Sequence, residues 1–132
     1  MNIYLSYKQS WLNEKLLRKE LKKIKDILTN KWHKVFVWIL DEPNRDKLTS
    51  DEIMRITKEK IKDSDLVLCY IKYKEKSEWM LLELGIWYAL NKKIKILMKR
   101  SLQDERRWIY GITKDIIFWE DEKEFWELLI KI

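Results

Sequence analysis

Continuous apolar runs alternate with amphipathic segments along this chain. Runs rich in β-branched and aromatic residues predict five strands, at Ile3–Tyr7, Val35–Leu40, Leu66–Ile71, Ile94–Met98 and Ile116–Trp119. Apolar residues at helical spacing predict helices at Asn13–Leu28, from the caps at Thr49–Glu52 to about Lys62, at Trp79–Asn91 and at Glu122–Ile132. Strands that are apolar throughout are typical of a parallel sheet covered on both faces. We therefore expect an α/β fold, a flavodoxin-like, three-layer, doubly wound sheet of about five parallel strands.

Glu83 is the only charged residue in the run W-M-L-L-E-L-G-I-W-Y-A-L-N, residues 79–91. The run is apolar nearly all round, so we expect its helix to be buried on most faces. Burying a carboxylate is costly unless it is paired or used, and burial raises its pKa. The sequence leaves two interpretations open, a working carboxylate and a carboxylate satisfied by a structural ion pair.

Doubly wound sheets bind ligands outside the carboxyl ends of their strands, near the switch in strand order. Here those positions are Ser6–Ser10, Leu40–Asn44, Lys72–Trp79 and Lys99–Arg106, the last being part of a charged loop or short helix. Glu83 lies one turn into the helix that begins at this edge. We therefore expect its side chain to reach the crevice.

Composition narrows the function classes. The 132 residues are 46% hydrophobic, which suits a single globular domain over residues 1–132. One cysteine excludes an intrachain disulfide, and with no signal-peptide pattern or membrane-length apolar run we expect a cytoplasmic location. No set of metal ligands at suitable spacing appears, so we expect no metal and no bound cofactor. The net charge of +6 permits an anionic ligand, but Lys and Glu are interspersed, so nucleic-acid binding is not favoured.

The segment S-E-W-M-L-L-E-L, residues 77–84, resembles the S-x-W-x-x-x-E-L signature of TIR domains. The segments I-Y-L-S-Y (3–7), D-E-P-N (41–44) and E-F-W-E-L-L (124–129) resemble the first TIR box, the BB loop and the third box. This resemblance implies an NAD hydrolase that releases nicotinamide, with NAD as substrate and Glu83 as the catalytic residue.

The segment E-L-G-I-W-Y-A-L-N-K-K-I-K-I-L, residues 83–97, resembles the nucleoside 2-deoxyribosyltransferase-like proteins, which include deoxynucleotide N-hydrolases. This second resemblance implies that Glu83 is the nucleophile that takes the sugar. It matches Tyr4 to an aromatic residue of the first strand, and Ser77 to a position that contacts a phosphate or a sugar.

The chain departs from this second family in three places. Trp79 and Leu81 stand where its members carry glycines before the glutamate. The segment Y-K-Q-S, residues 7–10, stands in place of a phosphate-binding loop, and the family's aspartate on the preceding helix falls near Thr57. Because of these departures, the TIR-like hypothesis ranks first.

Both resemblances require the same chemistry. A carboxylate beneath the anomeric carbon can stabilise or attack the oxocarbenium-like sugar that forms when an N-glycosidic bond breaks. Besides Glu83, the candidate substrate-binding residues are Tyr4, Ser6, Tyr7, Trp38, Asp41, Ser77 and Trp79. The aromatic rings would stack on a base or nicotinamide, and these are Tyr4, Tyr7, Trp38 and Trp79. The hydroxyls of Ser6 and Ser77 would donate to a ribose or a phosphate. The Asp41 carboxylate would bind ribose hydroxyls. Core filling, helix capping and turn formation are the alternatives. Lys8, Arg106 and Arg107 could neutralise a phosphate.

Three hypotheses follow. The first is an NAD hydrolase, and the second is a hydrolase or transferase acting on deoxynucleosides or their monophosphates. The third is a non-catalytic TIR-type interaction module, in which Glu83 pairs with a buried Lys or Arg. Either family implies a homo-oligomer, a dimer or larger.

Overall fold

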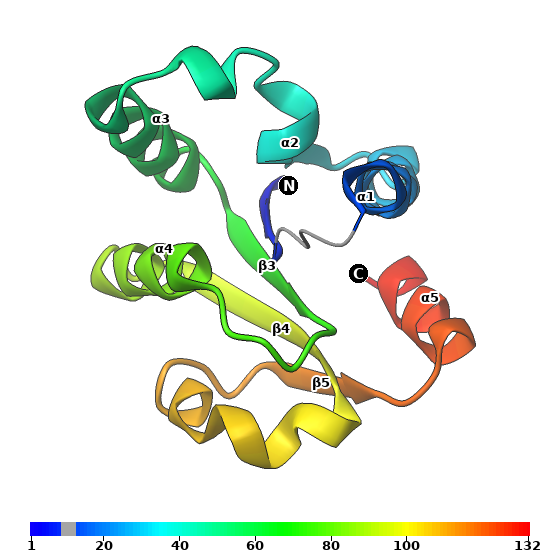
Figure 1. Ribbon diagram of the computed structural model, residues 1–132. Coiled ribbons are helices and arrows are strands. Elements are labelled where there is room, and N and C mark those ends of the chain that lie inside the picture. The colour runs from blue at the N-terminus through cyan, green and yellow to red at the C-terminus, as the bar shows by residue number, and fades with distance from the viewer. Residues whose placement is uncertain (9–12) are drawn as a thin grey trace.

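A parallel sheet of five strands forms the centre of the computed structural model, which describes residues 1–8 and 13–132 (Figure 1). The strands are β1 (Asn2–Ser6), β2 (Lys34–Phe36), β3 (Leu66–Ile71), β4 (Lys93–Lys99) and β5 (Ile116–Trp119). Their order in the sheet is β2-β1-β3-β4-β5, and every neighbouring pair is parallel. The predicted doubly wound α/β fold is therefore confirmed, and its strand order switches between β1 and β3.

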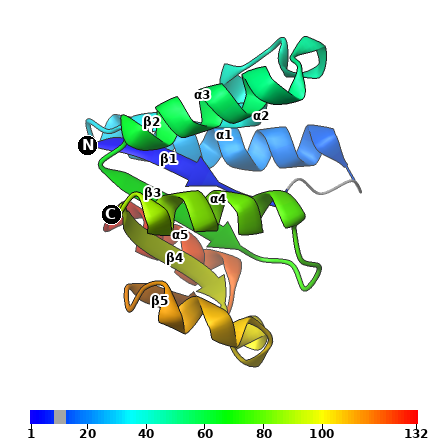
Figure 2. The same cartoon turned by 90° about the vertical axis from the view of Figure 1, so that its left-hand side faces the viewer.

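Helices cover both faces of the sheet (Figures 1 and 2). One face carries α1 (Glu14–Asn30) and α5 (Glu122–Ile130), and the other carries α3 (Ser50–Lys62) and α4 (Glu78–Ala89). The shorter helices are α2 (Trp38–Asp41), η1 (Arg45–Lys47) and η2 (Arg100–Gly111). Side chains of Asn13, Thr49, Ser77 and Asp121 cap α1, α3, α4 and α5.

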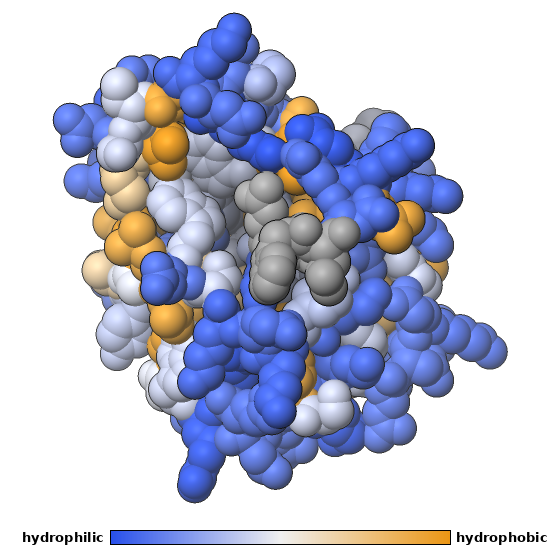
Figure 3. Space-filling view, viewed as in Figure 1, coloured by the Kyte–Doolittle hydropathy of each residue, from blue (hydrophilic) through white to orange (hydrophobic). Residues whose placement is uncertain are grey.

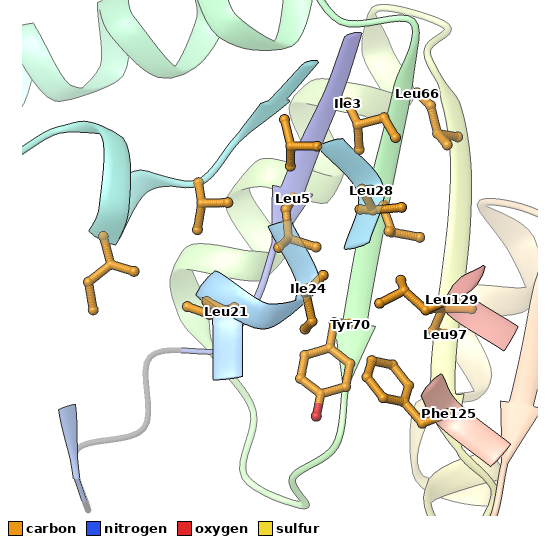
Figure 4. Packing of buried hydrophobic residues seen from close by; sticks show 14 of the residues in the cluster. Ile3, Leu5, Leu21, Ile24, Leu28, Leu66, Tyr70, Leu97, Phe125 and Leu129 are labelled. Atoms are coloured by element: carbon orange, nitrogen blue, oxygen red, sulfur yellow. The ribbon is translucent and has the colours of Figure 1, made fainter. Parts of the chain in front are cut away.

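Alternation along β1 divides its side chains between the two cores. Ile3 and Leu5 pack with α1 and α5, where Figure 4 shows them beside Leu21, Ile24 and Leu28. Tyr4 belongs to the core beneath α3 and α4. Because side chains of a strand alternate with a period of two, Tyr4 and Ser6 point to the same side as α4.

The second predicted strand, Val35–Leu40, is wrong beyond Phe36. The chain leaves the sheet at Val37 and forms α2 instead. Side chains satisfy the freed backbone, since the Asp41 carboxylate accepts from the Val37 N–H at 2.7 Å and the Tyr7 hydroxyl from the Ile39 N–H at 3.0 Å. β2 is also an edge strand with one neighbour, so ending it early sacrifices few ladder hydrogen bonds.

The expected burial of the 79–91 helix on most faces is wrong for one face of α4. Met80, Glu83, Leu84 and Trp87 are buried. Leu81, Leu82 and Tyr88 are 42%, 45% and 59% exposed. On the face shown in Figure 3, apolar side chains gather on the side of α3 and α4, whereas hydrophilic side chains dominate the remainder. Across residues 1–8 and 13–132, no helix is both long and apolar enough to cross a membrane.

Candidate active site

Glu83 lies buried between α4 and β1, with only 2% of its surface exposed. One carboxylate oxygen, Oε2, accepts a hydrogen bond from the Tyr4 hydroxyl, and Oε1 accepts one from Ser6 Oγ at 3.0 Å. No lysine or arginine of the described chain forms a salt bridge with it. Glu83 is therefore held by neutral donors, and the buried Lys or Arg partner expected from the interaction-module hypothesis is not observed among the described residues.

Burial raises the pKa of the Glu83 carboxyl from its ordinary 4.5 to about 7. Hydrogen bonds from Tyr4, Ser6 and the Trp79 side chain oppose this shift, because each stabilises the ionised form. A group with this pKa exists in both protonation states near neutral pH. Such a carboxyl can accept or release a proton under ordinary conditions.

A pocket of about 300 Å³ opens above Glu83 at the carboxyl edge of the sheet. Its lining comprises Leu5, Tyr7, Trp38, Arg45, Asp46, Ile53, Ser77, Trp79 and Glu83. The structure thus brings together Glu83 and four of the candidate substrate-binding residues, Tyr7, Trp38, Ser77 and Trp79. Aromatic rings form much of its wall, which suits a planar base.

Tyr4 and Ser6 lie behind Glu83 and not on the pocket wall. They are 0% and 1% exposed, and both donate to the carboxylate. The Tyr4 hydroxyl in turn accepts a hydrogen bond from Trp38 Nε1 at 3.0 Å. In this structure, the two residues hold Glu83 instead of facing a substrate.

Ser77 caps α4 and also lines the pocket. Its Oγ accepts from the Met80 N–H at 3.2 Å, which leaves the hydroxyl proton for another acceptor. Tyr7 also lines the pocket, and burial raises the pKa of its phenol to about 12. Tyr7 is therefore a neutral phenol in any physiological buffer.

Asp41 does not line the pocket. Its carboxylate accepts from the Val37 N–H and pairs with Lys25 on α1, so it stabilises the start of α2. The physical reason is the turn into α2, which directs this side chain back toward its own helix. The position predicted for gripping ribose hydroxyls is therefore occupied by a structural residue.

The three cations considered for a phosphate also lie outside the pocket lining. Arg106 is 5% exposed and donates to the carbonyls of residues 73, 74 and 75 at 3.1, 3.0 and 3.2 Å. Lys8 pairs with Glu75 at 3.8 Å, and Arg107 is exposed. Residues 9 and 10 of the Y-K-Q-S segment lie outside the described residues.

Sequence reasoning missed Arg45 and Asp46 of η1, which line the pocket. The Arg45 guanidinium is held at 2.7 Å by Glu14 of α1, and its side chain is 18% exposed. A signal did exist, because the loop after the second strand was placed at the ligand-binding edge. The expected segment, Leu40–Asn44, stopped one residue short of Arg45.

Thr57 does not replace the family aspartate that falls near it. It is fully buried, it is absent from the pocket lining, and its Oγ1 has no hydrogen-bond partner in the described part of the chain. Residues 1–8 and 13–132 also contain no cluster of His, Cys, Asp and Glu able to hold a metal ion.

Solved structures with the same fold include two enzymes that act on nucleosides or nucleotides. The CMP N-glycosidase BcmB of Clostridium botulinum superposes with a TM-score of 0.70 and 19% identity over 100% of both chains. A 2-deoxyribosyltransferase from Bacillus psychrosaccharolyticus gives 0.62 and 22%, over 100% of this chain and 92% of the other. A conserved protein from Enterococcus faecalis V583 gives 0.60 and 17%, over 98% and 86%. This chain shares their fold.

No protein-family model and no curated protein sequence matches the chain. The structural likenesses, at 17%, 19% and 22% identity, show the fold that the chain shares with these proteins. They give no support to the TIR assignment.

Proposed function

We propose that this protein cleaves the N-glycosidic bond of a nucleotide, with Glu83 acting on the anomeric carbon of the sugar. The observation that carries this proposal is a buried carboxylate without a cationic partner among the described residues, at the floor of an aromatic pocket. The fold shared with a CMP N-glycosidase and a 2-deoxyribosyltransferase supports the same class of chemistry.

The chemistry needs Glu83 in its ionised form. As the bond between C1′ and the base breaks, the base leaves with the electron pair and takes up a proton, and positive charge develops on the sugar. The carboxylate stabilises this charge or bonds to C1′. In hydrolysis, water then supplies a hydroxyl to C1′ and releases one proton. In transfer, a second base takes the place of water, bonds to C1′ and releases a ring N–H proton. In both cases any bond between Glu83 and C1′ breaks, which returns the carboxylate.

Arg45 favours a phosphorylated substrate. It lines the same pocket as Glu83, where its guanidinium pairs with Glu14 at 2.7 Å and with Asp46 at 3.7 Å. Guanidinium groups bind phosphate through paired hydrogen bonds. The Ser77 hydroxyl proton offers a second donor in the same pocket. We therefore rank a phosphorylated substrate above a free nucleoside. The fold shared with a CMP N-glycosidase favours a nucleoside 5′-monophosphate over NAD, and this class includes the deoxynucleoside monophosphates of the second hypothesis.

NAD cleavage is the second candidate. Ser77, Trp79 and Glu83, the three residues that carry the S-x-W-x-x-x-E resemblance, all line one pocket. A nicotinamide ring also suits aromatic walls, and NAD carries phosphates that Arg45 would attract.

A substrate panel tests the proposal. Purified protein at high concentration is incubated with ribo- and deoxyribonucleoside 5′-monophosphates, the matching nucleosides, and NAD, and released base is measured by HPLC. We expect base from monophosphates faster than from nucleosides. Glu83→Gln should lower the rate by about a thousandfold or more while leaving the fold intact. Glu78→Gln, the same change at an exposed site on α4, should retain activity.

Each other outcome has a defined meaning. Nicotinamide from NAD, with no base from the monophosphates, would replace the proposal by the second candidate. New nucleotide in the presence of an added free base would identify a transferase. No product from any compound, with well-folded protein, would contradict the enzyme hypothesis and favour an interaction module.

A further inference from the structure

Trp38 is linked to Glu83 through one shared hydroxyl. Its indole Nε1 donates to the Tyr4 hydroxyl at 3.0 Å, and that hydroxyl donates to Glu83 Oε2. An indole N–H is a donor only, so it can never accept the Tyr4 proton. With Trp38 donating to its oxygen, the single proton of Tyr4 is directed to the carboxylate.

We infer that Trp38 is a positioning residue: it fixes the Tyr4 hydroxyl as a hydrogen-bond donor and thereby favours the ionised form of Glu83. The hydrogen bond from Tyr4 lowers the pKa of Glu83, in opposition to burial. A tyrosine free to rotate would present its lone pairs to a protonated Glu83 as readily as its proton to an ionised one. The hydrogen bond from Trp38 leaves the Tyr4 hydroxyl able only to donate to Glu83.

The turn into α2 makes this contact possible. Had the second strand continued to Leu40, Trp38 would lie in the sheet layer at its edge. Instead, Trp38 opens α2, is 8% exposed, and belongs to the same core as Tyr4. The wrongly predicted part of the strand is therefore the segment that supplies the positioning residue.

Several side chains near Glu83 are ionisable, unlike that of Trp38, and they act on the site differently. Glu83 acts electrostatically on the phenol of Tyr7, which follows β1, and on the Cys69 thiol of β3. Burial raises the pKa of both groups, so both are neutral near pH 7. Arg45 lines the pocket, and its charge acts on Tyr7. None of these groups shares a hydrogen bond with the Tyr4 hydroxyl in the described residues.

Direct measurement of the Glu83 pKa tests the inference without any substrate. Glutamate labelled with ¹³C at the side-chain carboxyl is titrated by NMR, and Glu83→Gln assigns the signal. Trp38→Phe should raise the Glu83 pKa by about one unit, because the Tyr4 hydroxyl would no longer be fixed as a donor to the charged carboxylate. Tyr4→Phe should raise it at least as far, and the double variant should match Tyr4→Phe alone.

Trp87→Phe is the matched control. Trp87 is fully buried and packs edge-on against the Tyr4 ring at 5.7 Å, but its Nε1 has no hydrogen-bond partner in the described chain. This variant should leave the Glu83 pKa unchanged within error. If Trp38→Phe disturbs the fold, replacing Trp38 with benzothienylalanine preserves the ring shape and removes only the N–H.

Two results would overturn the inference: an unchanged Glu83 pKa in Trp38→Phe, or a further rise when this change is added to Tyr4→Phe. The catalytic consequence rests on the proposed function. If that function holds, the acid limb of kcat/KM moves to higher pH in Trp38→Phe, and the loss in kcat shrinks well above the new pKa. A shifted pKa with no activity in the parent would reject the proposed function and retain the role of Trp38.

Discussion

Glu83 is subject to two opposing influences. Burial disfavours its charge, whereas the hydrogen bonds that Tyr4 and Ser6 donate favour it, and the balance leaves its pKa at about 7. A lysine partner would have lowered the pKa and blocked access to the carboxylate. Neutral donors instead orient both oxygens and leave the group able to change charge.

This balance predicts a pH-dependent stability. The folded state holds the Glu83 proton more tightly than the unfolded chain, so its contribution is fully present below pH 4.5 and is lost as pH rises to about 7. Relative to Glu83→Gln, the parent should lose about 3 kcal/mol of unfolding free energy across this window and no more above it. Urea unfolding at a series of pH values measures the difference.

Other titrating groups cancel in that comparison, because both proteins carry them. A difference that does not change with pH would show that burial does not perturb Glu83. A gain in the unfolding free energy of the parent relative to Glu83→Gln as pH rises would mean that the folded state prefers the carboxylate.

Sequence could identify Glu83 and most of the aromatic and hydroxyl side chains around it, but not the cation that lines the pocket. A single charge in an otherwise apolar helix is visible as a pattern, and its place one turn into the helix follows from the topology. Arg45 is one cation in a charged loop, and nothing local distinguishes it from Arg107. Its position on the pocket depends on the contact with Glu14 of α1, which sequence spacing does not reveal.

At the scale of elements, Arg106 connects η2 to the segment that precedes α4. Its guanidinium donates hydrogen bonds to the carbonyls of Tyr73, Lys74 and Glu75, which lie close to the cap of α4 at Ser77. These carbonyls would lose their partner if the guanidinium were removed. The segment that carries Ser77 to the pocket is thus fixed from outside the site.

Arg106→Ala should therefore lower the unfolding free energy by about 3 kcal/mol, because buried polar groups lose their hydrogen bonds. Amide exchange of residues 73–77 should accelerate. The neighbouring change Arg107→Ala removes an exposed guanidinium and should stay within about 0.5 kcal/mol of the parent. Equal effects of the two substitutions would contradict the role given to Arg106.

How well each element could be predicted depends on whether local sequence or a distant contact determines where it ends. β3 and β5 lie where the apolar runs indicated, and α1, α3 and α5 begin next to their capping side chains. The end of β2 was predicted wrongly because V-F-V-W-I-L is equally apolar on both sides of the turn. What ends the strand is a pair of side-chain acceptors, Asp41 and Tyr7, and the second of these is remote in sequence.

At the scale of the molecule, α4 leaves an apolar face in solvent. Leu81, Leu82 and Tyr88 are exposed there, and exposed apolar groups on one helix favour association. We expect a homo-oligomer, a dimer or larger, as both resemblances imply.

Sedimentation or light scattering across a range of concentrations tests this expectation. Leu82→Glu should weaken self-association about tenfold or more, because a charge would have to be buried in the contact. Leu16→Glu is the matched control, since Leu16 is also exposed but lies on α1, on the opposite face of the sheet. A parent that stays monomeric throughout would contradict the expectation.

The bond between Tyr4 and Glu83 joins residues 79 positions apart, and it exists only when the first strand has docked beneath the fourth helix. Contacts so distant in sequence require most of the intervening chain to be organised. A partly folded molecule can keep α4 and still leave Glu83 in water, with the acidity of an ordinary glutamate. The pKa of the Glu83 carboxyl therefore reports whether β1 and α4 have packed together, and the proposed reaction depends on that packing.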